Sequence, residues 1–276
     1  MTPDLITRIP FAFARSGLFR PGNASSAILV DAVIPSSRDY AIELTSSGPA
    51  LRACHGLAWQ TLVALAIQQH GHLAPIEVWP SEVLRLMGRH GEIQSRARAW
   101  LRALLDDLSA CSVAASTPIH AYVGPLLASV AVMDDGKLSI SFDPEMARFV
   151  ENEYVAVPLS QKSQLGDHPL AHWLHDYIAT HRDTYVASVA AIHRLCGSTL
   201  TPSKFRARLR DALDLLVSGP SALIGYTLND DQLTLRKHKT TVVRLTKSNV
   251  VAFRAAPSRT QHAVSQARHQ RARVAL

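Results

Sequence analysis

Two amphipathic helices dominate the pattern of this sequence, and each ends the same succession of shorter elements. The first is predicted over Ser95–Leu108 and the second over Pro202–Leu216. On each helix apolar side chains recur at helical spacing along one stripe, while arginine and lysine stand on the other side. Each follows a shorter helical segment across a glycine-containing break and precedes a stretch with hairpin character. This twofold recurrence restricts the fold to two modules of similar construction.

The elements before and after the first basic helix have clear signals. Leu57–His70 is almost entirely apolar, which predicts a central helix that ends at Gly71. Ile76–Trp79 reads as a short strand, and Pro80 opens a second helix with Ser81 as a plausible N-cap. The region Cys111–Phe142 carries alternating apolar stretches with a turn at residues 134–136, which predicts a hairpin.

The second module is predicted from the same kinds of signal. We expect helices over Pro169–His181 and Tyr185–Cys196, the second closed by Gly197, and a hairpin over Ala222–Arg236. This order, with a helix, a short strand, two further helices and a hairpin, is that of a winged-helix domain. The predicted fold class is therefore mainly α with short β-hairpins (α+β), arranged as tandem winged-helix domains.

The predicted domain boundaries follow from composition and charge. Residues 1–50, interrupted by proline, glycine and serine, are expected to form a partly ordered arm. Residues 51–150 and 151–240 are the two winged-helix domains, and 241–276 is a basic C-terminal tail. Lys237–Leu276 holds nine basic residues and no acidic one, leaving 20 of the 29 basic residues to balance 22 acidic residues elsewhere. The net charge of +7 therefore belongs to the tail, where it favours phosphate without sequence choice.

Cysteine usage and hydropathy indicate a soluble, cytoplasmic protein. Cys54, Cys111 and Cys196 are odd in number, far apart and outside any C-x-x-C motif, as suits a reducing compartment. We see no signal peptide, and the longest nearly apolar run, Ala121–Met133, is too short to span a bilayer.

The candidate DNA-binding residues are mainly the basic side chains of the two third helices and their flanks. Winged-helix domains place the third helix in the major groove, where arginine pairs with guanine or clamps phosphate. The same residues would be ordinary solvated faces if each helix stood alone; their matching positions in two modules favour binding. The candidates are Arg85, Arg89, Ser95, Arg96, Arg98, Arg102, Ser203, Lys204, Arg206, Arg208, Arg210, Arg236 and Lys237.

No arrangement of residues predicts catalysis. His168, His172 and His175 share one face of a helix, and a pair at i, i+4 can bind zinc, but no H-E-x-x-H motif or further ligand accompanies them. We therefore expect a solvated or DNA-facing surface there, with no metal and no cofactor. The sequence contains no P-loop and no G-x-S-x-G motif. The protein is predicted not to be an enzyme.

Three segments resemble the TrfA-type plasmid replication initiators. The segment Arg15–Phe19 after Ile9-Pro10 resembles that family's I-P-x-x-x-x-R-S-A-L-F signature, with Gly17 where the family tends to have alanine. Pro169–His175 with Tyr177 and His181 resembles P-L-A-x-W-L-H…Y-x-S-H. Leu195–Ser198 followed by Phe205–Leu213 resembles L-C-G-S…F-R-x-x-L-x-x-A-L. The resemblance covers about residues 9–236.

The resemblance implies a function at a plasmid origin. Such initiators bind iterons (tandem direct repeats in double-stranded DNA), help to open an adjacent A·T-rich element, and recruit the host initiator DnaA and the replicative helicase. It also implies a possible homodimer. The alternative is a tandem winged-helix transcriptional regulator, which would need a ligand-sensing domain or a palindromic site. A histidine-dependent metal enzyme is a third possibility, which metal analysis would reveal.

Overall fold

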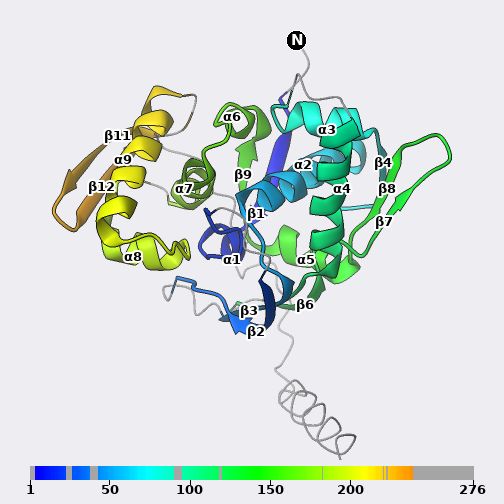
Figure 1. The fold of residues 1–276 in the computed structure, drawn as a ribbon, viewed down its shortest axis with the longest axis horizontal. Helices are drawn as coiled ribbons and strands as arrows, with labels where there is room; N and C mark the ends of the chain where they lie inside the picture. The colour runs from blue at the N-terminus through cyan, green and yellow to red at the C-terminus, as the bar shows by residue number, and fades with distance from the viewer. Residues whose placement is uncertain are drawn as a thin grey trace, which may run out of the picture. The chain divides into compact units, whose positions relative to one another are not determined.

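The chain passes twice through helix, strand, helix, helix and hairpin (Figure 1). The computed structural model describes residues 4–22, 27–37, 43–89, 95–117, 120–181, 183–219, 221 and 223–238. Every strand pair described is antiparallel and the sheets are small. The predicted α+β fold is confirmed.

The first module consists of three helices and a three-stranded sheet. Its elements are α2 (Ala53–His70), β4 (Ile76–Val78), α3 (Pro80–Leu86), α4 (Ser95–Ala110), β7 (Ser129–Val132) and β8 (Leu138–Ser141). The helix α2 ends where Gly71 adopts a left-handed φ of 79°, a conformation that suits glycine. The sheet has the order β4-β8-β7, so the short strand joins the hairpin. Pro80 is the first residue of α3, but its N-cap is Trp79 and not Ser81.

The second module repeats this construction. Its elements are α7 (Pro169–Ala179), β10 (Tyr185–Ser188), α8 (Val189–Leu195), α9 (Pro202–Ser218), β11 (Leu223–Asn229) and β12 (Gln232–Lys237). The order β10-β12-β11 matches that of the first sheet. The prediction of one helix over Tyr185–Cys196 was wrong at its start, because Tyr185–Ser188 pairs with β12. The helix begins only after Ser188, whose side chain accepts a hydrogen bond from the Ala191 amide.

An additional four-stranded sheet belongs to the first half of the chain. It has the order β2-β3-β5-β6 and is formed by β2 (Ile28–Val33), β3 (Glu43–Pro49), β5 (Ser112–Ser116) and β6 (Ala121–Pro125). The region predicted as a single hairpin, Cys111–Phe142, is therefore divided between two sheets. Its first two strands join β3, and its last two form the hairpin of the first module.

The N-terminal segment is part of the folded core, in contrast to the expected partly ordered arm. It forms β1 (Ile6–Pro10) and the short helix α1 (Phe11–Ala14). The strand β1 pairs with β9 (Tyr154–Pro158), which lies between α5 (Pro144–Asn152) and α6 (Leu159–Ser163). The side chains of α1 are all buried. This pairing joins segments from opposite ends of the first 160 residues, so local sequence patterns carry no signal for it.

Two hydrophobic cores meet through the first helix of each module. One core surrounds α2 and the other is formed by α7, α8 and α9 with their sheet. A smaller cluster, which includes Ile9, Phe11, Val155 and Val157, lies where β1 pairs with β9.

The described residues up to His238 belong to one compact unit, and the expected tail, 241–276, lies outside the described residues. No helix in the described part of the chain is long and apolar enough to cross a membrane.

Candidate nucleic-acid interface

The helix α4 buries one face and presents arginines on the other. Its buried side chains are Ala97, Leu101, Leu104, Leu105 and Leu108. Ser95, Arg96 and Arg98 are exposed, and no carboxylate within the described ranges pairs with either arginine. Arg102 is half-buried, and its Nε donates to Asp106 Oδ1 at 2.9 Å, one turn further along. Arg96 and Arg98 are therefore the cations of α4 that are most available to an external anion.

The helix α9 has the same division. Phe205, Leu209, Ala212, Leu213 and Leu216 are buried, as the apolar stripe predicts. Ser203, Lys204, Arg208 and Arg210 are exposed, and Arg206 is half-buried. Within the described part of the chain, the one ion pair of these cations joins Arg208 to Asp211, with 4.0 Å between nitrogen and oxygen. Such a long, exposed pair is weak and competes little with a phosphate.

The remaining candidates differ in availability. Arg85 on α3 and Arg236 on β12 are exposed. Arg89 is half-buried: its guanidinium lies 4.0 Å from the centre of the Trp100 ring and 3.5 Å from Asp167 Oδ1. Arg89 therefore links the first module to the loop before α7, and binding DNA through it would require these contacts to change.

Lys237 does not belong to the interface, contrary to the sequence-based prediction. Its side chain is buried, and Nζ donates to the carbonyl oxygens of Ile178 and His181 at the end of α7. Burial lowers the pKa of this ammonium to about 8. A cation near the C-terminus of a helix is stabilised by the orphan carbonyls there, which explains its position.

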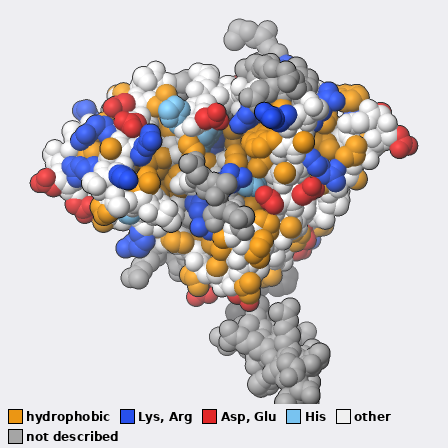
Figure 2. Space-filling view, in the orientation of Figure 1, with side chains coloured by type: hydrophobic (Ala, Val, Ile, Leu, Met, Phe, Trp, Pro, Cys, Tyr) orange, Lys and Arg blue, Asp and Glu red, His pale blue; other side chains and the backbone are white. Residues whose placement is uncertain are grey.

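The two third helices flank a central pair of helices. The helix α9 packs on α7, α7 packs on α2, and α2 packs on α4. Figure 1 shows α9 and α4 both on the near side of the molecule, separated by α7 and α2. In the same orientation, Figure 2 shows lysine and arginine side chains over the parts of the surface that contain α9 and α4, and others between them. One face thus presents both groups of cations.

Parts of all three segments that carry the family resemblance meet at the joint between the modules. Arg15 Nε donates to Thr180 Oγ1 at 2.8 Å, and Arg15 Nη2 donates to the Thr180 carbonyl at 3.0 Å. Trp173 Nε1 donates to the Ser16 carbonyl at 2.7 Å. Gly17 lies so close to the turn after α8 that a Cβ added there would be 3.0 Å from the Leu195 carbonyl oxygen. These residues therefore hold the modules together and do not form the basic surfaces.

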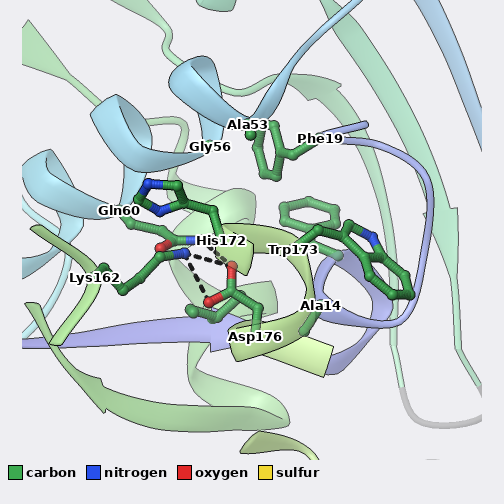
Figure 3. A pocket seen from close by; sticks show the side chains of 11 residues that line it. Ala14, Phe19, Ala53, Gly56, Gln60, Lys162, His172, Trp173 and Asp176 are labelled. Atoms are coloured by element: carbon green, nitrogen blue, oxygen red, sulfur yellow. Dashed lines mark hydrogen bonds and ion pairs between the residues drawn. The ribbon is translucent and has the colours of Figure 1, made fainter. Parts of the chain in front are cut away.

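A buried polar cluster crosses the same joint (Figure 3). Gln60 on α2 donates through Nε2 to Asp176 Oδ2 at 2.8 Å, and Lys162 on α6 donates to both oxygens of that carboxylate at 2.7 and 2.6 Å. Burial raises the pKa of Asp176, but the Lys162 ammonium outweighs this effect and holds it at about 2. Removing either ion would leave an uncompensated buried charge, which is strongly destabilising. The sequence analysis missed this cluster, although an aspartate within the apolar helix α7 was a signal for it.

His172 and His175 do not form the expected solvated or DNA-facing surface, whereas His168, directly before α7, is exposed as expected. His172 and His175 are buried, because α7 is covered by neighbouring elements on both sides. His172 Nε2 lies 2.9 Å from the Gly166 carbonyl oxygen, and His175 Nε2 lies 3.2 Å from Gln161 Oε1. Burial lowers the pKa of His172 to about 4, so the ring is neutral near pH 7. No group of three or more potential metal ligands occurs in the portion of the chain that the structure describes.

Two modules, each with three helices and a sheet in the order first-third-second strand, define a tandem winged-helix protein. No protein-family model matches the chain, and a search of curated proteins finds no match. Two crystal structures of domains 2 and 3 of RctB share the fold. The selenomethionine derivative has a TM-score of 0.54 at 15% identity, covering 83% of this chain and 98% of that chain. The other, RctB residues 155–483, has a TM-score of 0.51 at 15% identity, covering 80% and 95%.

Proposed function

We propose that this protein is a plasmid replication initiator that binds duplex DNA through α4 and α9. The observation that carries the proposal is the matching position of the two helices. Each is the third helix of its module, and each presents exposed arginines that make no strong ion pair with any described residue. Both lie on one face, so a single chain could occupy two successive parts of a duplex (Figure 2). The fold shared with RctB domains 2 and 3 and the resemblance to TrfA-type initiators support this assignment.

The proposed work of the protein is binding, not catalysis. Phosphate contacts would position the modules, and arginine contacts with base edges would select the sequence. Binding energy spent on deforming DNA would assist opening of an adjacent A·T-rich element. The resemblance extends the proposal to iterons as the binding sites, to recruitment of DnaA and the replicative helicase, and to an inactive homodimer. The site of action would be plasmid DNA in the bacterial cytoplasm.

Footprinting on DNA that flanks the coding gene tests the proposal. We expect protection of several direct repeats, with one protomer on each, because both third helices come from one chain. A titration monitored by analytical ultracentrifugation gives the number of protomers per repeat. A single inverted repeat protected by a symmetric dimer would contradict the proposal and favour the transcriptional regulator. A protein that protects no sequence within these fragments would also count against it.

A further inference from the structure

Two arginines outside the predicted DNA-binding set lie side by side at the joint. Arg20 directly follows the segment that packs against the second module, and Arg52 directly precedes α2. Their backbones form an isolated parallel bridge. The amide of Ala53 donates to the Arg20 carbonyl at 3.2 Å, which fixes the two positions relative to each other. Both residues are half-buried.

Arg20 also borders the turn that leads to the second basic helix. This turn contains Gly197, between α8 and α9, and a Cβ added at Gly197 would lie 3.7 Å from the Arg20 Cβ. The pair therefore joins the beginning of α2 to the turn that precedes α9. Since α2 itself packs on α4, these two cations lie between the elements that hold the two third helices.

Neither guanidinium has an ion-pair partner among the residues with described positions. The nearby carboxylate of Asp107 is engaged by His55, whose Nε2 lies 3.0 Å from Asp107 Oδ2. Burial raises the pKa of the nearby Cys54 thiol, and the positive charge of Arg52 opposes that rise. Two neighbouring cations without carboxylates suit an external anion, and the planar guanidinium fork matches the oxygens of a phosphate.

We propose that Arg20 and Arg52 bind the phosphate backbone of the duplex where it passes between α4 and α9. The inference rests on the proposed function, since it assigns a third contact to the same DNA-binding face. A phosphate contact at the joint would set the spacing and orientation of the two third helices on DNA without reading bases. It would therefore contribute affinity and salt dependence but little sequence choice.

The test compares the double variant Arg20→Gln/Arg52→Gln with a control that removes the same charge elsewhere. The control is Arg8→Gln/Arg148→Gln, because Arg8 stacks on Tyr154 and Arg148 pairs with Glu145. Affinity is measured at several salt concentrations for the footprinted repeat and for a duplex of random sequence. The Arg20→Gln/Arg52→Gln variant at the joint cannot neutralise these two phosphates. Its slope of log affinity against log salt concentration should therefore be shallower by about 2, while the ratio of the affinities for repeat and random DNA stays constant. The control should keep the wild-type slope.

The outcomes distinguish a failure of the proposed phosphate contact at Arg20 and Arg52 from a failure of the proposed function. An unchanged slope in the joint variant, or an equally shallow slope in the control, overturns the inference while leaving the proposed function intact. Wild-type protein that prefers no repeat over random DNA contradicts the proposed function instead. If the joint variant fails to fold, methylphosphonate substitution of the repeat replaces it. Neutral linkages between the two footprinted segments should then weaken binding of the wild-type protein, and no effect at any of them overturns the inference.

Discussion

At the scale of single residues, Arg206 and Arg210 should determine sequence recognition by the second module. Neither arginine belongs to the buried face of α9, so replacing both with alanine should preserve the fold. Removing each arginine that pairs with a base should reduce discrimination by about 1–3 kcal/mol. Binding titrations on the repeat and on random duplex measure this ratio, with Arg148→Ala as a surface control. A double variant that retains wild-type discrimination would show that α9 does not read DNA.

His172 should make the fold sensitive to acid. Its pKa of about 4 in the folded protein lies below the ordinary value of 6.5, because burial disfavours the charged ring. As the pH falls from 6.5 towards 4, the His172 ring therefore becomes protonated in the unfolded chain but stays neutral in the folded chain. The free energy of unfolding should fall over this window, by up to roughly 3 kcal/mol from this residue. Urea titrations at several pH values should show a weaker dependence for His172→Gln, and an equal dependence in both proteins would contradict this assignment.

At the scale of secondary-structure elements, the packing of the N-terminal segment against the turn after α8 should control the position of α9. Alanine is the residue that the resembling family tends to have at position 17, yet here its Cβ would lie 3.0 Å from the Leu195 carbonyl oxygen. Gly17→Ala should therefore destabilise the protein by about 1–3 kcal/mol, as overpacking does. Gly22→Ala is the matched control, because nothing lies within 4 Å of the added Cβ. Gly17→Ala should lower the thermal unfolding temperature and weaken repeat binding, and Gly22→Ala should change neither. Equal stability of the two variants would show that the turn after α8 moves to accommodate the added Cβ at no cost.

At the scale of the whole molecule, we predict that the basic C-terminal segment adds affinity for DNA without sequence choice. Truncation before Pro257 removes Arg259, Arg268, Arg271 and Arg273, which lie outside the described residues. The salt slope should become shallower by up to about 4, and the ratio of repeat to random affinity should stay constant or rise. Replacing the four arginines with glutamine in the full chain should reproduce the effect. A truncated protein with an unchanged slope and no origin activity would instead indicate that this segment docks a partner.

The sequence by itself determined the two third helices and which faces of them are buried. The periodic leucines of α4 and α9 specify an apolar stripe, and the arginines opposite must then face solvent. The twofold order of elements followed from equally local signals. Only the tertiary structure decided which polar side chains are buried. His172 is buried because neighbouring elements cover α7, Lys162 is buried against Asp176 of that helix, and Lys237 is buried at its end. Residues 185–188 are a strand because a distant strand pairs with them. Such contacts join positions far apart in the chain, so no local periodicity encodes them.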